Sequence, residues 1–464
     1  MIAGKLEEIV KVIDAELDSA TELQTEFCGL SIDTRTIAAR NIFVAIEGEV
    51  HDGHKFVSQA AEKGASVIIA ERGNQHPIPE NLKPKTVLVD DSKLALRQLG
   101  RWWKNKFDLK VVALTGTNGK TTTKEMIAET LAQKYKVFRT PGNFNNLYGI
   151  PLSLCKLDDS FEVAVLELGM SYPGEIETLT KLVNPDIALI TNIGPAHLET
   201  MGSIENIAQA KFELLDNLRA DALVILNLDD KILRSRFETE KHSKLGFAVN
   251  SAAEIKPAGF SSNSFGRMIF NYEEQEIHLA VPGLHNLYNA LSACAVGRQM
   301  DIAPAEIKTA LENYHSSNSR MQIVSAGAVT IIDDSYNANP TSMRFALQVL
   351  SQVDIPDRKI AILGDMRELG SDEVGMHQEV GRIIAELNPD MLITAGHLGM
   401  QIATGANYNG FDPQKTRTYI KTEDIFEFID NDLHEGDCVL VKASRAMQFD
   451  KIVNKIKQHF GEVD

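Results

Sequence analysis

One short segment limits the fold of this chain more than any other. Residues 115–122 read Thr115-Gly116-Thr117-Asn118-Gly119-Lys120-Thr121-Thr122. They follow a compact apolar run, 111–114, and precede a stretch of helical composition, 124–132. Glycines in such a loop let the backbone approach phosphate groups, and the start of the following helix adds aligned N–H donors. The segment therefore predicts an α/β fold with a phosphate-binding loop between a strand and a helix.

The side chains of this loop point to a nucleoside triphosphate. Lys120 is expected to lie against the β- and γ-phosphates, and the hydroxyl of Thr121 is expected to bind Mg²⁺. The loop departs from the pattern G-x-x-x-x-G-K-[ST], which would require glycine at Leu114. A glycine turn that merely carries a lysine is the alternative, and the strand–loop–helix context favours ATP. A guanine-nucleotide switch is disfavoured because no N-K-x-D follows a later strand.

The length of 464 residues suggests about three domains at roughly 150 residues each. We expect three α/β domains in series, at 1–107, 108–315 and 316–464, with polar linkers near 105–108 and 313–320. The central one should contain a P-loop-type, mostly parallel sheet, and the C-terminal one should be Rossmann-like. Apolar runs predict strands at 42–46, 66–70, 86–89, 111–114, 163–168, 187–190, 223–226, 329–333, 360–363, 391–394 and 438–441, and other patterns predict helices at 55–63, 92–103 and 288–300.

Charge and composition exclude several classes of protein. The net charge is −17 without a compensating basic stripe, so a nucleic-acid partner is not expected. The apolar runs fall far short of the ~20 residues that span a bilayer, and the acidic start lacks the features of a secretion signal. We therefore expect a cytoplasmic protein without membrane insertion, and a monomer. The four cysteines have no metal-site spacing, which indicates reduced, mostly packed thiols.

Several further motifs occur in a fixed order around the loop. They are TPGNFNN (140–146), LELGMSYPGEI (166–176) and TNIGPAHLETMGS (191–203). Together with the phosphate loop they resemble the Mur ligase family. DDSYNANPTSM (333–343), LGDMRELG (363–370) and the N-terminal IDTRTIAARNIFVAIEGEVHDGHKF (32–56) are similar to the D-alanyl-D-alanine-adding members. Two motifs differ from the usual D-S-R and K-G-S-R: they read D-T-R at 33–35 and K-A-S-R at 442–445.

The resemblance implies an ATP-dependent amide ligase in peptidoglycan precursor synthesis. It implies that a carboxylate of UDP-N-acetylmuramoyl-tripeptide is activated as an acyl phosphate and then joined to D-alanyl-D-alanine. The implied cofactors are ATP and two Mg²⁺ ions, with Thr121, Glu167, His197 and a carbamylated Lys211 as metal ligands. From the residues alone, Glu167 is an acid at a strand end, where ligands commonly bind. His197 alone would be structural, and Lys211 looks like an ordinary surface lysine.

The remaining expected site residues divide by ligand. The catalytic set is Lys120, Glu167, His197, Lys211 and Arg320. ATP is expected to contact Thr115, Gly116, Thr117, Asn118, Gly119, Lys120, Thr121, Asn286, Asn289, Arg320, Asp334 and Asn337, with Tyr336 and Asn339 in the same loop as Asn337. The sugar nucleotide is expected to contact Asp33, Arg35, the loop 51–54, Thr140, Asn143, Asn145 and Asn146, and the carboxylate of D-alanyl-D-alanine is expected to contact Lys442 and Arg445. Asn286 and Asn289 are three residues apart and therefore share a helix face.

Other functions stay open at this point. A different Mur ligase or a folylpolyglutamate synthase would share the chemistry, although the motifs of the third domain argue against both. A P-loop ATPase or kinase, or a nucleotide-regulated binding protein, would use the same loop without forming an amide. The third residue of the tripeptide could be diaminopimelate or lysine. If the site is divided among three domains, we expect domain closure on substrate binding.

Overall fold

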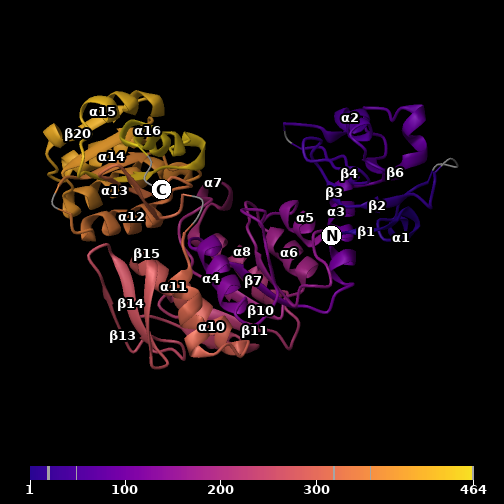
Figure 1. The fold of residues 1–464 in the computed structure, drawn as a ribbon, viewed down its shortest axis with the longest axis horizontal. Helices are drawn as coiled ribbons and strands as arrows, with labels where there is room; N and C mark the ends of the chain where they lie inside the picture. The colour runs from indigo at the N-terminus through magenta and orange to yellow at the C-terminus, as the bar shows by residue number, and fades with distance from the viewer. Residues whose placement is uncertain (18–20, 49, 317–318, 356, 462–464) are drawn as a thin grey trace. The chain divides into compact units, whose positions relative to one another are not determined.

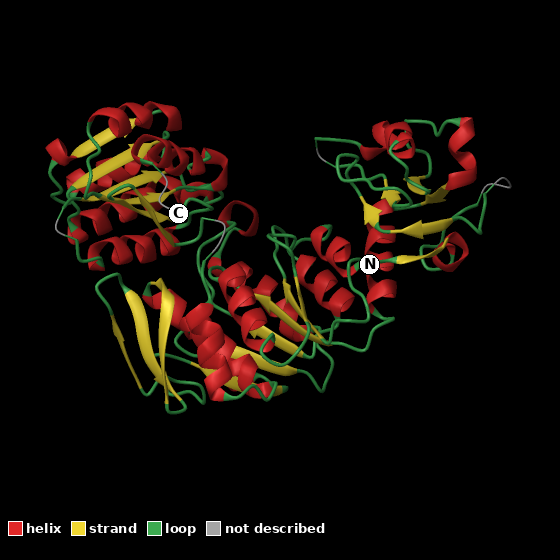
Figure 2. Cartoon of the chain, in the orientation of Figure 1, coloured by secondary structure: helices red, strands yellow, loops and turns green. Residues whose placement is uncertain are grey.

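The computed structural model describes residues 1–464 except 18–20, 49, 317–318, 356 and 462–464. The described chain packs into two compact units. The first contains Met1–Leu114, Lys134–Ala188 and Glu213–Ala222, and the second contains Thr115–Gln133, Leu189–Phe212 and Leu223–Asp464. Helices and parallel strands alternate through most of both units, so the α/β class is confirmed (Figures 1 and 2). The predicted domain boundaries at 107 and 315 stay predictions.

The N-terminal part of the first unit is built on a parallel sheet with strand order β3-β4-β5-β6. Predicted strands 42–46, 66–70 and 86–89 correspond to β4, β5 and β6, with ends that differ by up to two residues. The predicted helix 55–63 is instead a 3₁₀ turn followed by a short α-helix. The elements are β1 (Ala3–Lys5), α1 (Leu6–Val10), β2 (Glu26–Cys28), β3 (Leu30–Ser31), β4 (Ile42–Val44), η1 (Gly53–Phe56), α2 (Val57–Glu62), β5 (Val67–Glu71), η2 (Glu80–Lys85), β6 (Thr86–Val89) and α3 (Ser92–Lys104).

Alternation along the strands explains how this sheet is covered. Phe43 and Ile68 pack with Val57 and Ala60 of α2 in one buried cluster. Their neighbours along the strands, such as Ile69, point to the other face of the sheet and are also buried. Both faces of the sheet are therefore covered. Asp91 caps α3 by accepting a hydrogen bond from the backbone N–H of Leu94 at 2.9 Å.

The central sheet has six strands in the order β12-β11-β10-β7-β9-β8. The strand pairs β7–β9, β8–β9 and β11–β12 are parallel, and the predicted strands 111–114, 163–168, 187–190 and 223–226 all belong to this sheet. The elements are β7 (Lys110–Thr115), α4 (Lys120–Leu131), β8 (Val137–Arg139), α5 (Gly149–Leu154), β9 (Val163–Glu167), α6 (Glu175–Val183), β10 (Ile187–Ile190), α7 (Leu198–Met201), α8 (Ile204–Asp216), β11 (Leu223–Asn227), α9 (Lys231–Thr239), β12 (Ser243–Phe247), α10 (Leu284–Gln299) and α11 (Pro304–Asn313).

A three-stranded antiparallel sheet in the second unit was not predicted. Its strands are β13 (Gly259–Ser262), β14 (Arg267–Tyr272) and β15 (Gln275–Pro282), in that order (Figure 1). Every residue of β13 is exposed, so this strand carries no apolar pattern. The predicted strands left residues 227–328 without a strand, so this sheet adds to the predicted architecture. Helix α10 also begins four residues before the predicted start at 288, because β15 ends at Pro282 and only Gly283 separates it from the helix.

The C-terminal sheet has the strand order β16-β17-β21-β18-β19-β20, antiparallel at β16 and parallel elsewhere. Neighbouring strand residues point to opposite faces: Ile332 packs with α12, α13 and α14, whereas Ile331 packs with α15 and α16. The elements are β16 (Gln322–Ala326), β17 (Val329–Asp333), α12 (Pro340–Gln352), β18 (Lys359–Gly364), η3 (Gly370–Asp372), α13 (Glu373–Leu387), β19 (Met391–Ala395), α14 (Gly399–Tyr408), η4 (Pro413–Lys415), β20 (Thr416–Tyr419), η5 (Thr422–Ile425), α15 (Phe426–Asn431), β21 (Cys438–Lys442), η6 (Arg445–Met447) and α16 (Asp450–Phe460).

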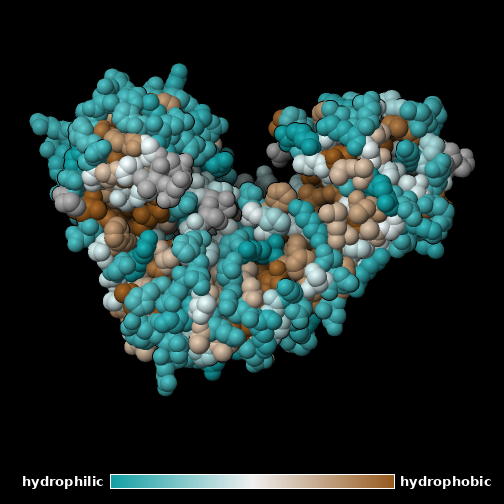
Figure 3. Space-filling view, viewed as in Figure 1, coloured by the Kyte–Doolittle hydropathy of each residue, from teal (hydrophilic) through white to brown (hydrophobic). Residues whose placement is uncertain are grey.

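All four cysteines carry free thiols, as the spacing predicted. Cys155, Cys294 and Cys438 are buried, and burial raises the pKa of each thiol, to about 12 for Cys155 and Cys438. Cys28 is exposed. Hydrophilic residues dominate the face in view in Figure 3. Within the described part of the chain, we find no helix with the length and apolar character to cross a bilayer.

Candidate active site

The phosphate loop turns sharply between β7 and α4, and two glycines permit the turn. A Cβ atom at Gly116 would lie 1.9 Å from Oγ1 of Thr191, and one at Gly119 would lie 2.5 Å from Oδ1 of Asn289. Gly119 also has a φ of +78°, in the region that favours glycine. Helix α4 then begins at Lys120, four residues before the predicted start at 124. The N–H groups of its first turn therefore face the loop, as a phosphate site requires.

The strand end after β10 holds the loop in place, a function that was not predicted from the sequence. The backbone N–H groups of Thr117 and Asn118 donate to the backbone and side-chain oxygens of Asn192, each at 2.9 Å. The hydroxyl of Thr191 donates to the carbonyl of Asn118 at 2.8 Å. The motif TNIG at 191–194 therefore acts as a scaffold for the loop. Its polar residues directly after an apolar strand were the available sequence clue.

The polar groups of the loop fit a bound polyphosphate. Nζ of Lys120 folds over the loop and donates to the carbonyls of Gly116 and Thr117, at 2.9 and 3.2 Å. Oγ1 of Thr115 and Nδ2 of Asn118 are buried, and within the described residues neither has a hydrogen-bond partner. Buried polar groups rarely lack partners, so these atoms indicate a place where a ligand completes the site.

Glu167 lies at the end of β9, where the sequence predicted it, and is 2% exposed. In the β7–β9 ladder it pairs with Leu114, the residue directly before the phosphate loop. Two substrate-binding candidates contact it: Nδ2 of Asn145 donates to its Oε1 at 2.7 Å, and its backbone N–H donates to Oγ1 of Thr140 at 3.1 Å. The first unit therefore brings Thr140, Asn145 and Glu167 into one cluster.

Lys211 is 3% exposed, so its interpretation as an ordinary surface lysine was wrong. Burial, with a smaller contribution from the charge of Lys120, lowers the pKa of Lys211 well below its usual value. The spacing contained a signal: Ile207, Leu214 and Leu215 lie four residues before and three and four residues after Lys211, on one face of α8. A lysine on the apolar face of a helix is a candidate for an uncharged amine.

His197 lies directly before α7 with a φ of +54°. Its Nδ1 is 2.5 Å from Oε2 of Glu368, a residue of the loop after β18 that was not among the predicted site residues. The hydrogen bond with His197 lowers the pKa of the Glu368 carboxyl. Glu368 lies in the motif LGDMRELG (363–370), but nothing in the local spacing indicates a contact with His197, which lies 171 residues away in the chain.

The expected Mg²⁺ ligands can be tested by their chemistry. Among the described residues, no group of three or more His, Cys, Asp and Glu side chains has the arrangement of a metal site. Mg²⁺ commonly binds one or two protein oxygens and takes its other ligands from phosphates and water. The hydroxyl of Thr121 and the carboxylate of Glu167 are such oxygen donors. Each of these two donors therefore suits Mg²⁺ that arrives with a nucleotide.

Asn286 and Asn289 share a face of α10, as predicted, but the structure gives both amides protein partners. Nδ2 of Asn289 donates to Oδ1 of Asn286 at 2.9 Å, and Oδ1 of Asn289 accepts from the hydroxyl of Thr123 in α4 at 3.0 Å. Nδ2 of Asn286 donates to the carbonyl of Pro282 at 2.7 Å. Both side chains are buried, and they connect α10 with the helix of the phosphate loop.

The strand ends of the C-terminal sheet gather the remaining candidates. Nζ of Lys442, at the end of β21, lies 2.5 Å from Oδ2 of Asp334 and donates to the carbonyl of Asn337 at 2.8 Å. The Arg320 guanidinium stacks on the ring of Tyr336, 3.8 Å from its centroid. The expected ligands of ATP and of D-alanyl-D-alanine therefore touch each other here. Arg445 reaches the same loop through its backbone N–H, 3.4 Å from the side-chain oxygen of Asn337.

The candidates for the sugar nucleotide lie in the first unit. The Arg35 guanidinium pairs with Asp33 at 2.6 Å and keeps an exposed side chain, which leaves donors available to a phosphate. His54 of the loop 51–54 is buried and uses both ring nitrogens in protein contacts, with Asp52 at 2.7 Å and with the backbone N–H of Glu71 at 2.9 Å. Asp52 and His54 of this loop therefore stabilise the fold of the first unit through their contacts with each other and with Glu71.

Asn143 and Asn146, the other expected substrate ligands, lie in the loop before α5. The backbone carbonyl of Asn143 accepts from the backbone N–H of Asn145 at 2.7 Å. Oδ1 of Asn146 accepts from the backbone N–H groups of Tyr148 and Gly149, at 3.1 and 2.8 Å. Asn146 therefore shapes the start of α5, while Asn145 contacts Glu167.

Comparison with protein families covers most of the chain. Residues 26–103 match the model described as "Mur ligase family, catalytic domain". Residues 114–297 match "Mur ligase middle domain", and residues 319–445 match "Mur ligase, glutamate ligase domain". The three matches follow one another in the order in which the sequence motifs occur.

Curated relatives and solved structures agree with these matches. The UDP-N-acetylmuramoyl-tripeptide–D-alanyl-D-alanine ligase of Bacillus subtilis (strain 168) is 35% identical over 98% of this chain and 99% of its own length. The ligase of the same name from Escherichia coli (strain K12) is 30% identical over 99% of each chain. A crystal structure of MurF from Acinetobacter baumannii covers 99% of each chain with a TM-score of 0.89 and 29% identity. The MurF ligase from Thermotoga maritima, solved in complex with ADP, covers 93% of this chain and 97% of its own, with a TM-score of 0.81 and 28% identity. This chain belongs to the Mur ligase family.

Proposed function

We propose that this protein is an ATP-dependent amide ligase that adds D-alanyl-D-alanine to UDP-N-acetylmuramoyl-tripeptide during peptidoglycan precursor synthesis. The observation that carries the proposal is the phosphate loop with its two buried, unpartnered polar atoms, at Thr115 and Asn118. Relatives with this name match along nearly the whole chain, which supports the choice of substrates. We place the reaction in the cytoplasm, where ATP is available, and expect a monomer.

The reaction has two steps. A carboxylate oxygen of the tripeptide attacks the γ-phosphorus of ATP, the bond to the β–γ bridging oxygen breaks, and an acyl phosphate and ADP result. The amine of D-alanyl-D-alanine then attacks the acyl carbon, loses a proton to solvent and expels inorganic phosphate. Phosphoryl transfer of this kind depends mainly on positioning and on cations that offset the developing charge. Bound Mg²⁺ would supply part of that positive charge.

Different residues of the chain are proposed to contact the phosphates, Mg²⁺ and the substrate. Lys120, at the start of α4, is proposed to contact the β- and γ-phosphates, and Thr121 and Glu167 to hold Mg²⁺ through oxygen. Arg320, stacked on Tyr336, is proposed to reach the triphosphate from the C-terminal part. Because Thr140 and Asn145 touch Glu167, we infer that the carboxylate to be activated binds beside that acid.

Lys211 is proposed to act as a carbamate. An uncharged amine can attack CO₂, lose a proton and become an anionic carbamate with two oxygens. Burial lowers the pKa of Lys211 and so favours the uncharged amine. The product would turn this buried amine into an anionic oxygen ligand for a second Mg²⁺, together with His197. Mass spectrometry of the intact protein, without acid treatment that decomposes carbamates, should detect the mass of one added CO₂ in the wild type and not in Lys211→Met.

The Lys442–Asp334 ion pair bears on where the incoming dipeptide binds. Lys442 is 2% exposed and already paired with Asp334, so we propose that it orders the loop 334–339, which is expected to contact ATP. Arg445, whose side chain is exposed at the same strand end, is then the candidate that binds the carboxylate of D-alanyl-D-alanine. This assignment separates two residues for which the motif predicted one shared role.

One assay tests the proposal as a whole. Phosphate release is measured with ATP, Mg²⁺ and UDP-muramoyl-tripeptide, with and without D-alanyl-D-alanine, and the products are identified by mass spectrometry. Release that requires both substrates and yields the pentapeptide supports the ligase. ATP hydrolysis without the dipeptide, and without an adduct, would favour an ATPase instead. Parallel reactions with the diaminopimelate and lysine forms of the tripeptide identify the third residue.

A further inference from the structure

Glu368 is the one partner of His197 that comes from a distant part of the described chain. Nδ1 of His197 and Oε2 of Glu368 are 2.5 Å apart. The same two loops are also joined through the backbone, because the N–H of Glu199 donates to the carbonyl of Glu368 at 3.3 Å. The carboxylate of Glu368 therefore holds one edge of the imidazole, and the backbone hydrogen bond holds the loop that carries His197.

The backbone conformations show that this contact is specifically built. His197 and Glu368 have φ angles of +54° and +63°, a region that residues other than glycine rarely occupy. Gly370 follows with a φ of +71°, and a Cβ atom there would lie 3.4 Å from the backbone nitrogen of Glu199. For residues other than glycine, such conformations are strained, and they occur most often at functional sites. Each of the two loops therefore contains a strained residue at the point where the loops meet.

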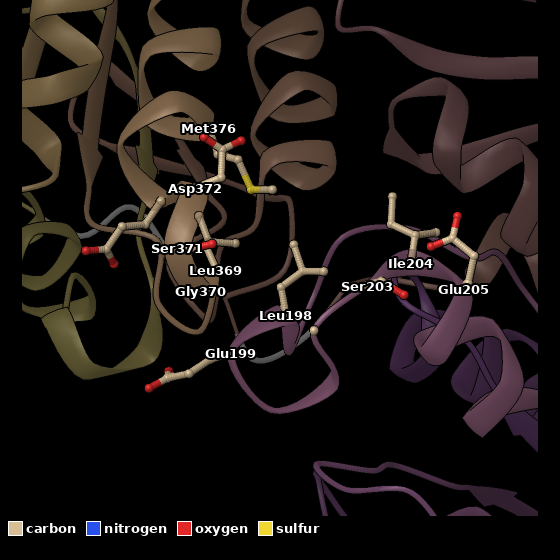
Figure 4. Close-up of a pocket in the computed structure, with 12 residues that line it drawn as sticks. Leu198, Glu199, Ser203, Ile204, Glu205, Leu369, Gly370, Ser371, Asp372 and Met376 are labelled. Atoms are coloured by element: carbon tan, nitrogen blue, oxygen red, sulfur yellow. The ribbon is translucent and has the colours of Figure 1, made fainter.

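The contact borders a hollow of about 860 Å³. One side of the hollow is formed by Leu198, Glu199 and residues 202–205, and the other by residues 369–373 and Met376 (Figure 4). The side chains of His197 and Glu368 are 33% and 56% exposed. The imidazole is thus held at Nδ1 while part of its surface stays accessible to a ligand.

The chemistry of the pair fixes the state of the imidazole. An ionised carboxylate only accepts hydrogen bonds, so Nδ1 must carry the proton, and in the neutral ring the lone pair is then at Nε2. A histidine that binds a metal usually donates its other ring N–H to a carboxylate or carbonyl in this way. We propose that Glu368 is a positioning residue that holds His197 in the Nδ1–H tautomer and directs Nε2 toward the metal that accompanies ATP. This inference rests on the proposed role of His197.

The histidine and its carboxylate partner come from different segments of the chain. His197 belongs to the segment that matches the middle domain of the family, and Glu368 to the segment that matches the third. The imidazole is therefore oriented only while the loop after β18 is docked on the turn before α7. A change that undocks this loop should weaken metal binding without removing any metal ligand.

The test compares Glu368→Ala and Glu368→Gln with Glu199→Gln, which removes a carboxylate from the same pair of loops without touching His197. Long-range ¹H–¹⁵N NMR, with the signal assigned through a His197→Gln variant, should show the Nδ1–H tautomer in the wild-type protein. Glu368→Ala should shift His197 toward the Nε2–H tautomer and weaken Mn²⁺ binding, with a non-hydrolysable ATP analogue present, by about 10-fold or more. Glu368→Gln keeps an acceptor oxygen and should lie between the two. Glu199→Gln should match the wild type.

Two results would overturn the inference. One is an unchanged tautomer in Glu368→Ala, and the other is a changed tautomer with wild-type Mn²⁺ affinity, which would make the contact merely structural. Melting temperatures of all variants check that they are folded. Neither readout requires turnover, so a protein that proves not to ligate D-alanyl-D-alanine would refute the proposed function and leave this test intact.

Discussion

The side chain of Asn339 donates from Nδ2 to Oδ1 of Asn118 at 2.8 Å and so joins α12 to the phosphate loop. The other end of the same amide caps α12, because its Oδ1 accepts from the backbone N–H of Ser342 at 2.9 Å. One residue thus connects a helix start in the C-terminal part with the loop that is proposed to bind ATP.

The two functions of Asn339 can be separated by substitution. Asn339→Asp keeps an oxygen that can cap α12 but loses the donor to Asn118, whereas Asn339→Ala loses both. We expect both variants to raise the KM for ATP several-fold. Only the alanine variant should also lose about 1 kcal/mol of stability, or roughly 2–4 °C in Tm. A wild-type KM in Asn339→Asp would show that the link to Asn118 does not serve nucleotide binding.

Substitution of Lys211 should separate stability from activity. Because burial lowers the pKa of this amine, protonation disfavours the folded state, and the wild-type protein should gain stability as pH rises toward the ordinary lysine pKa near 10.5. Lys211→Met should be insensitive to this effect and at least as stable at pH 7. Its turnover should nevertheless fall by about 100-fold, if the lysine supplies a metal ligand.

The control for Lys211 uses CO₂. Removal of bicarbonate from the assay should lower wild-type activity reversibly, whereas Lys211→Met should not respond. Wild-type activity in Lys211→Met, measured as pentapeptide formation, would show that no carbamate is needed.

Substitution of one residue of the Asp334–Lys442 pair should lower the stability more than substitution of both. Lys442 is almost fully buried, so Asp334→Asn leaves an ammonium without its counter-charge, and we expect a loss of about 3 kcal/mol in unfolding free energy. The double variant Asp334→Asn with Lys442→Met should recover much of that loss. Urea unfolding of the single and double variants measures the difference. Additive effects of the two substitutions would mean that the pair is not coupled.

A pH effect on stability is expected at Glu240, after α9, whose side chain is 2% exposed and therefore little screened by solvent. Although burial raises the pKa of this carboxyl, hydrogen bonds from His242 and Arg236 lower it to about 2, against 4.5 for an ordinary glutamate. The resulting stabilisation is present above pH 4.5 and is lost as pH falls toward 2, about 2 kcal/mol of it between pH 5 and 3. The stability advantage of the wild type over Glu240→Gln should therefore shrink over that range in urea titrations. An advantage that is constant with pH would contradict this assignment.

The parallel strands and the phosphate loop could be predicted because their signals are local. Buried strands such as 187–190 are uninterrupted apolar runs, and glycines followed by a lysine at the start of a helix are typical of a phosphate-binding turn. The exposed strand β13 has no such pattern, since its pairing with β14 depends on partners and not on burial. Strand β15 did alternate, with Ile277, Leu279 and Val281 buried, and a period-two search would have found it.

Within the candidate site, the residue types were predictable and several contacts were not. The sequence placed Glu167 correctly at a strand end, but it could not show that Asn145 and Thr140 meet it. Glu368 was missed, because a contact with His197 across 171 residues leaves no trace in local spacing. Lys442 was assigned to the dipeptide, whereas the fold buries this lysine against Asp334.

The distribution of thiols offers a practical route to observing this protein at work. A maleimide dye reacts with accessible thiolate, and of the four cysteines only Cys28 is exposed while burial raises the pKa of the other three. Labelling of the unaltered chain should therefore place a single fluorophore on β2, without any substitution. Fluorescence from that position would report directly on what happens near the N-terminal sheet when ATP and the sugar nucleotide are added.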